Sequence, residues 1–126
     1  MLEQKIKVLL VEDDTMLVDM YFMKFEGEGF DVWKAGNGVE GMALLAEKGK
    51  PDIILLDVIM PQMDGFSMLK TIKEGEHKDV PVILLTNLGQ ENDMKRGMEL
   101  GATDYLVKAN LTPQQVVDKV RAVLQK

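Results

Sequence analysis

Asp57 is the residue of this chain whose position most clearly favours chemistry. It follows four successive aliphatic residues, Ile53–Leu56, and precedes a turn-rich segment that contains Pro61 and Asp64-Gly65. Such an apolar run is typical of a central strand buried on both faces, and open α/β folds bind ligands at the carboxyl ends of their strands. The sequence therefore predicts that Asp57 is a metal ligand, a nucleophile or a cap for the helix that follows.

An acidic segment, Glu12-Asp13-Asp14, follows the apolar run Val8–Val11. If the two apolar runs are neighbouring strands, Glu12 and Asp13 converge with Asp57, and their repulsion costs on the order of 1 kcal/mol or more. A divalent cation that prefers oxygen ligands removes this cost, and Mg²⁺ suits a site of few carboxylates and several waters. We expect Asp14 or the threonine after it to cap the next helix, which leaves Glu12 and Asp13 for the metal.

Two further apolar runs end in a hydroxyl and in an amine. Thr86 follows Val82–Leu85, and Lys108 follows Tyr105–Val107. These are the groups that a phosphoryl group on Asp57 requires, because Lys108 and the metal would neutralise its oxygens and Thr86 would donate a hydrogen bond.

The apolar runs and turn signals predict five strands that alternate with five helices. The strands are expected at Ile6–Val11, Val32–Ala35, Ile53–Leu56, Val82–Leu85 and Tyr105–Val107. The helices are expected at Met16–Glu28, Val39–Glu47, Phe66–Glu74, Glu91–Leu100 and Pro113–Leu124, with Thr112 capping the last and Gly29, Gly49 and Gly101 ending three of them. Strict alternation with short connections predicts a parallel sheet with right-handed crossovers. The first, third and fourth strands are the most apolar and should be central, and the second should be an edge.

Composition narrows the classes of protein that need to be considered. The chain has 126 residues, 46% of them hydrophobic, which favours one domain spanning residues 1–126. Its net charge of −6 disfavours direct binding to a nucleic-acid backbone, which requires clustered lysine and arginine. The lack of cysteine excludes disulfides and thiolate metal sites and favours a cytoplasmic location. No signal peptide precedes the first strand, and no apolar segment reaches the roughly 18 residues of a membrane span.

Taken in order, these residues resemble a response-regulator receiver domain over essentially the whole chain. The matching positions are Glu12 and Asp13, Asp57 with the segment Met60-Pro61-Gln62-Met63-Asp64-Gly65, Thr86, Tyr105, and Lys108. The resemblance implies a flavodoxin-like, doubly wound α/β fold with five helices and strand order 2-1-3-4-5.

By this resemblance, Asp57 accepts a phosphoryl group from the phosphohistidine of a histidine kinase or a histidine phosphotransfer protein. The implied cofactor is Mg²⁺ or Mn²⁺, held by Asp13, Asp57 and the backbone carbonyl of Ile59, with Glu12 contributing through water. Lys108 is expected to pair with Asp57 before transfer and with the phosphoryl group after it.

The resemblance also implies a switch between two states. Thr86 would move toward the phosphoryl group and Tyr105 would turn inward, which remodels the face formed by the fourth helix, fifth strand and fifth helix for a protein target. The chain is expected to be a monomer, with dimerisation on phosphorylation through this face left open. It would be a signalling domain rather than an enzyme, assisting only its own phosphorylation and dephosphorylation.

The sequence departs from the family pattern at three places. Ala109 follows Lys108, where the family usually has proline; a cis bond before alanine costs about 2.5–4 kcal/mol, so we expect a different loop geometry here. Ile59 and Leu88 stand two residues after the phosphoacceptor and the switch hydroxyl, where many receivers have a polar residue that positions water. The position before Leu88, often alanine or glycine in the family, is the bulkier Asn87. We hypothesise that the two apolar side chains shield the phosphoryl group and lengthen its lifetime.

The helix expected at Met16–Glu28 is apolar nearly all round, whereas a surface helix normally has one apolar stripe. We predict that it docks the donor's helices with Val18 and Phe22 in the contact, and scattered surface apolar residues are the alternative. The single histidine, His77, lies in a polar loop and is interpreted as solvated.

Several functions remain in competition. The first is a phosphorylation-controlled switch, and the second is a relay carrier that passes the phosphoryl group to a histidine phosphotransfer protein. A module that binds protein without phosphorylation would be expected to lack an acid or the lysine. A phosphatase that uses an aspartyl phosphate would need a second acid in place of Ile59, and a flavin-binding protein would need a phosphate loop in place of Glu12-Asp13-Asp14. No P-loop is present.

Overall fold

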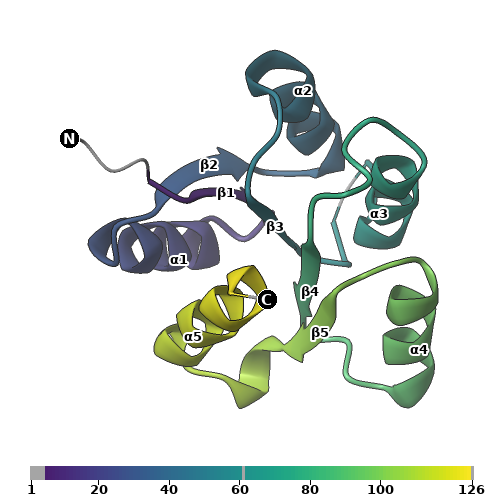
Figure 1. Ribbon diagram of the computed structural model, residues 1–126. Coiled ribbons are helices and arrows are strands. Elements are labelled where there is room, and N and C mark those ends of the chain that lie inside the picture. The colour runs from purple at the N-terminus through teal and green to yellow at the C-terminus, as the bar shows by residue number, and fades with distance from the viewer. Residues whose placement is uncertain (1–4, 61, 126) are drawn as a thin grey trace.

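The sheet and helices form three layers in the computed structural model, which describes residues 5–60 and 62–125 (Figure 1). The strands are β1 (Lys7–Val11), β2 (Asp31–Ala35), β3 (Ile53–Leu56), β4 (Val82–Thr86) and β5 (Asp104–Val107). The helices are α1 (Thr15–Gly27), α2 (Gly38–Lys48), α3 (Gly65–Lys73), α4 (Glu91–Glu99) and α5 (Pro113–Leu124). All ten predicted elements are confirmed, with ends that differ by at most one residue. Pro61, which the sequence assigns to the turn after Asp57, lies outside the described residues, as do residues 1–4 and 126.

The strand order is β2-β1-β3-β4-β5, with every neighbouring pair parallel, which confirms the fold class and the order implied by the resemblance. Because the strands are parallel, their carboxyl ends lie along one edge of the sheet. The three most apolar strands, β1, β3 and β4, are the inner strands of the sheet as predicted, and β2 is an edge strand as its alternating pattern predicts.

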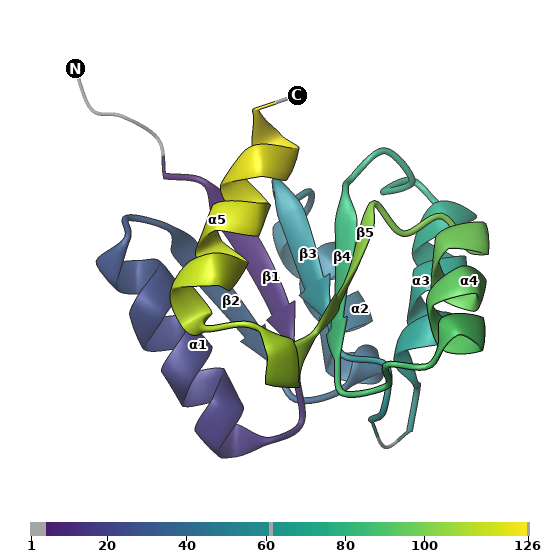
Figure 2. The same cartoon turned by 90° about the horizontal axis from the view of Figure 1, so that it is seen from below.

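Each face of the sheet is covered by its own group of helices, as Figure 2 shows: α1 and α5 on one side, α2, α3 and α4 on the other. Alternate residues of one strand point to opposite faces. Leu9 and Val11 of β1 therefore pack toward α2 and α3, whereas Val8 and Leu10 pack toward α1 and α5. This burial on both faces explains why the central strands read as continuous apolar runs.

Helix ends follow local signals in the sequence. Asp14 caps α1, accepting hydrogen bonds from the backbone N–H groups of Met16 and Leu17. Thr112 caps α5 in a reciprocal capping box with Gln115. Gly101, beyond α4, has a φ of 105°, a conformation that favours glycine.

None of the helices in the described part of the chain is both long enough and apolar enough to cross a membrane.

Candidate functional site

The register of the central strands brings two acids together. Val11 at the end of β1 pairs with Leu56 at the end of β3, so the next residue of each strand, Glu12 and Asp57, lies at the same edge. The backbone N–H of Asp57 donates to the Val11 carbonyl at 3.0 Å, and that of Glu12 donates to the Ala35 carbonyl at 3.0 Å. The sheet's hydrogen bonds therefore continue one residue past the strands and fix the backbone beneath both carboxylates.

The predicted acidic cluster is formed in the structure. Carboxylate oxygens of Glu12, Asp13 and Asp57 lie within 4.8 Å of one another. Glu12 and Asp57 are buried, whereas Asp13 is exposed at the rim. Three convergent carboxylates, one of them open to solvent, fit a small divalent cation that retains several waters, such as Mg²⁺.

Lys108 lies directly against the two buried acids. Its Nζ donates to Asp57 Oδ2 at 3.1 Å and also to Glu12 Oε1, and little of the side chain is exposed. The sequence predicts the contact with Asp57 but not the one with Glu12. Lys108 begins a short 3₁₀ helix, Lys108–Asn110, and the peptide bond to Ala109 is trans, since no cis bond occurs among the described residues. The predicted change of loop geometry at Ala109 therefore still leaves the amine at the site.

Burial and charge perturb this cluster. The pKa of Glu12 is raised from 4.5 to about 7, chiefly by burial and further by the charge of Asp57, although the hydrogen bond from Lys108 opposes the change. Burial alone would lower the pKa of Lys108, but its hydrogen bond to Glu12 and the nearby charge of Asp57 outweigh burial and raise it. Lys108 is therefore cationic, and it is the main charge that holds the buried acids in place.

One hollow of about 290 Å³ collects the groups that the sequence singles out. Its lining includes Glu12, Asp13, Asp57, Ile59, Thr86 and Lys108. Ile59 lines this hollow and is 60% exposed, and the exposed Asn87 lines it too. Leu88, which the sequence suggests as a second apolar shield, packs instead against the hydrophobic core.

Asp57 does not cap the helix that follows it, α3. Asp64 caps α3, accepting from the N–H of Ser67 at 2.9 Å. A side chain on Gly65 would meet the Asp57 carbonyl oxygen at 2.2 Å, so the helix begins directly against the backbone of Asp57. The Asp57 carboxylate faces Lys108 instead.

A chain of hydrogen bonds leads from this hollow to β5. The hydroxyl of Thr86 accepts the N–H of Leu88 at 3.3 Å, and the Leu88 carbonyl accepts the phenol of Tyr105. Tyr105 is only 6% exposed, so its side chain already lies inward. The backbone of Leu88 thus connects the predicted switch hydroxyl with the predicted switch aromatic, a link that the sequence does not reveal.

A sequence model of the response regulator receiver domain matches residues 8–121. The chain belongs to the response-regulator receiver family. Among curated relatives, this receiver is 36% identical over 121 residues to the DNA-binding dual master transcriptional regulator RpaA of Synechocystis, covering 95% of this chain and 49% of that protein. It is 39% identical over 120 residues to the transcriptional regulatory protein CpxR homolog of Haemophilus influenzae, covering 95% and 51%. The chain therefore spans about half the length of the curated relatives it matches.

Solved structures show the same fold. The chemotaxis protein CheY4 of Vibrio cholerae superposes with a TM-score of 0.87 at 30% identity, covering 95% of this chain and 99% of that one. The BeF3-activated N-terminal receiver domain of RstA from Klebsiella pneumoniae gives 0.87 at 26% identity, covering 95% and 99%.

In this receiver, Val18 and Phe22, the two α1 side chains predicted to contact the donor, are not the most exposed apolar side chains of the helix. Val18 and Phe22 are half-buried against the core, and the Lys34 ammonium lies 4.2 Å from the centre of the Phe22 ring. The exposed apolar positions are Met16, Met20 and Met23, which share one face of the helix. Apolar residues all round a helix do not reveal which face the core takes.

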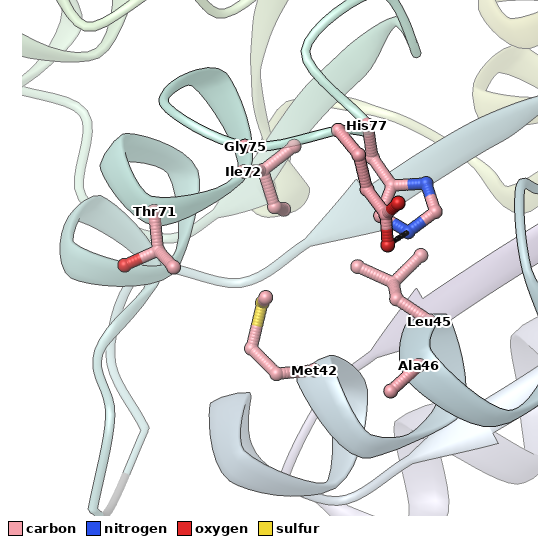
Figure 3. Close-up of a pocket in the computed structure, with 8 residues that line it drawn as sticks. Met42, Leu45, Ala46, Thr71, Ile72, Gly75 and His77 are labelled. Carbon is pink, nitrogen blue, oxygen red and sulfur yellow. Dashed lines mark ion pairs between the residues drawn. The ribbon is translucent and has the colours of Figure 1, made fainter.

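A second hollow of about 280 Å³ lies between α2 and α3, away from the acids (Figure 3). It is lined largely by apolar groups such as Leu45 and Ile72, and by His77. The His77 side chain is only 13% exposed and its Nε2 lies 3.6 Å from the carboxylate of Glu76, so its interpretation as solvated is wrong. The loop folds back over the groove, which the polar sequence around His77 does not indicate.

Proposed function

We propose that this receiver accepts a phosphoryl group on Asp57 from a phosphohistidine and thereby regulates the binding of a protein target. The observation that carries the proposal is the convergence of Asp57, Lys108 and two further acids at one edge of the sheet. Residues 1–126 would act as one receiver domain in the cytoplasm, as a signalling domain that assists only its own phosphorylation and dephosphorylation.

The transfer is a substitution at phosphorus. A carboxylate oxygen of Asp57 attacks the phosphorus atom, and the bond from phosphorus to the imidazole nitrogen breaks, with its electron pair going to that nitrogen. Little covalent chemistry is required of the protein beyond this, so catalysis depends on position and charge. The tight backbone around Asp57, fixed by its bond to Val11 and by the close approach of Gly65, supports that positioning.

Charge neutralisation comes from both sides of Asp57. Lys108, already 3.1 Å from Asp57 Oδ2, would pair with a phosphoryl oxygen, and the Thr86 hydroxyl would donate to another. Glu12, Asp13, Asp57 and the Ile59 carbonyl would hold Mg²⁺ or Mn²⁺, whose charge offsets that of the phosphoryl oxygens and of the acids themselves.

The switch would follow from the hydrogen bonds of Leu88. When the Thr86 hydroxyl turns toward a phosphoryl oxygen, it would lose the hydrogen bond that it accepts from the N–H of Leu88. The carbonyl of Leu88 accepts the hydrogen bond of the Tyr105 phenol, so a shift of Leu88 would reach Tyr105. Phosphorylation would therefore act on the position of Tyr105 and on the face formed by α4, β5 and α5.

The donor, a histidine kinase or a histidine phosphotransfer protein, would dock on α1, which begins beside the site. Val18 and Phe22 remain part of this proposed contact, and the exposed Met16 and Met20 extend it with flexible side chains suited to an adaptable interface. Phe22→Asp and Met16→Asp should each slow transfer from a protein donor, while phosphorylation by a small acyl phosphate should be unaffected.

The test of the proposed function is intact-mass measurement after incubation with acetyl phosphate and Mg²⁺. We expect a gain of one phosphoryl group that is lost in Asp57→Asn and in excess chelator. Asp64→Asn is the matched control, because asparagine caps a helix as well as aspartate does and α3 should remain intact. A phosphoryl group that persists in Asp57→Asn would refute the assignment. Return of the group to a histidine phosphotransfer protein would favour a relay carrier over a switch.

A further inference from the structure

The closest approach of α4 to the sheet is at Gly97. Within α4, all of which the structure describes, Gly97 is the one buried residue. A Cβ atom at this position would stand 2.6 Å from Leu84 Cδ1 and 3.0 Å from Tyr105 Cδ2. Real Cβ atoms essentially never approach another heavy atom as closely as the first of these distances. α4 can therefore pack this closely against β4 and β5 only because residue 97 has no side chain.

Backbone conformation does not explain a glycine here. Gly97 is not among the glycines with positive φ, which include Gly101 just beyond the helix. In the interior of a helix, glycine costs about 1 kcal/mol relative to alanine, because its backbone loses more freedom on folding. The remaining reason for glycine at this position is packing against Leu84 and Tyr105.

The two side chains under Gly97 differ in their freedom to move. Leu84 and Tyr105 are paired across β4 and β5 and share the face that α4 covers. Leu84 is fully buried in the middle of the core. Tyr105 lies on β5, an edge strand, and its phenol donates a hydrogen bond to the Leu88 carbonyl near the start of α4. If a side chain on residue 97 fills this space, Tyr105 rather than Leu84 is the side chain that can move out toward solvent.

We propose that Gly97 is a positioning residue for Tyr105. The inward ring lies in the space that a side chain on residue 97 would otherwise fill. The inference deepens the proposed switch, since it identifies what on α4 sets the orientation of the aromatic. The Leu88 carbonyl holds the phenol from the side of the hollow, and Gly97 makes room for the ring from the side of α4. The ring can lie inward only while α4 keeps its present separation from β5.

Gly97→Ala tests the inference through the ionisation of Tyr105. Burial, with the charges of Asp93 and Asp57, raises the pKa of Tyr105 to about 12 from the ordinary value of 10. We expect this pKa to fall toward 10 in Gly97→Ala, because an added Cβ drives the ring outward. The measurement is a titration of phenolate absorbance, with circular dichroism reporting the folded fraction at each pH. Tyr105→Phe identifies the Tyr105 step and separates it from that of Tyr21.

Gly27→Ala is the matched control. Gly27 is also helical, and a Cβ there would have no heavy atom within 4 Å. Both substitutions add the same methyl group to a helix, so a lowered pKa of Tyr105 in Gly97→Ala alone supports the proposal. An unchanged pKa of Tyr105 in a folded Gly97→Ala overturns it.

A second variant decides the outcome if Gly97→Ala does not fold. In Gly97→Ala/Tyr105→Ala the ring that meets the new Cβ is gone, so recovery of folding supports the proposal. Failure of this double variant to fold, with Tyr105→Ala itself folded, overturns it and makes Leu84 the controlling contact. These measurements use neither phosphoryl donor nor metal. A chain that gains no phosphoryl group would refute the proposed function and leave the Gly97 result standing.

Discussion

Replacing Glu12 with glutamine is predicted to stabilise the folded chain at neutral pH. Glu12 is 3% exposed and its pKa is raised from 4.5 to about 7, chiefly by burial. A carboxyl whose pKa is raised by folding stabilises the fold below its unfolded pKa and loses that contribution as pH rises through the folded pKa. The contribution of Glu12 to the free energy of unfolding therefore falls between pH 4.5 and about 7.

The size of the effect follows from the same pKa values. A change from 4.5 to about 7 corresponds to about 3–4 kcal/mol, at about 1.4 kcal/mol for each pKa unit. Glutamine resembles protonated Glu12 in shape and charge. Glu12→Gln should therefore match the wild-type chain in stability below pH 4.5 and exceed it by about 3–4 kcal/mol above pH 7.

The assay is urea unfolding of both chains across this pH range in the presence of chelator. Other carboxylates titrate in both proteins, so the difference between the two unfolding free energies isolates Glu12. Glu99→Gln, at an exposed position on α4, is the control and should show no such pH-dependent difference. Mg²⁺ should narrow the gap, because a cation at the acids favours ionised Glu12. A difference that stays constant with pH would refute the reasoning that burial governs Glu12.

Three further predictions concern the loop, the hollow and a cap. Ile59→Asn, at the exposed mouth of the hollow, should speed loss of the phosphoryl group several-fold by admitting water, measured by phosphate release after the donor is removed; an equal rate would refute shielding. Gly65→Ala should destabilise the fold by at least about 3 kcal/mol in urea unfolding, because its Cβ would lie 2.2 Å from the Asp57 carbonyl oxygen; a near-neutral effect would contradict that contact. Thr112→Ala should cost about 1 kcal/mol through loss of the capping box, whereas Thr112→Ser should retain most of it.

The order of elements was predictable because its signals are local. Apolar runs, caps and glycine stops each act within a few residues, and all ten strands and helices follow from them. The acids, Thr86 and Lys108 were predictable as a group for a related reason. Each lies at the carboxyl end of a strand or within two residues after it, and parallel strands end at one edge of a sheet.

His77, which the sequence analysis interprets as solvated, is mostly buried in the structure. The sequence also left open which face of α1 the core covers, and the structure shows Val18 and Phe22 half-buried against the core. Burial is a property of the packed molecule, and a helix that is apolar nearly all round gives no periodic signal of its covered face. The 3₁₀ turn at Lys108 was missed because three residues carry too little pattern.

Local patterns in the sequence were enough to predict the alternation of strands and helices, the family, and the side chains that gather at the carboxyl edge of the sheet. The packed molecule was needed to show that Lys108 bonds Glu12 as well as Asp57, that the backbone of Leu88 joins Thr86 to Tyr105, and that Gly97 of α4 lies against the Tyr105 ring. The residues proposed for the chemistry can be recognised in the sequence from their type and from their position at a strand end. Contacts between residues distant in the chain depend on the relative height and orientation of packed elements, which no local pattern contains.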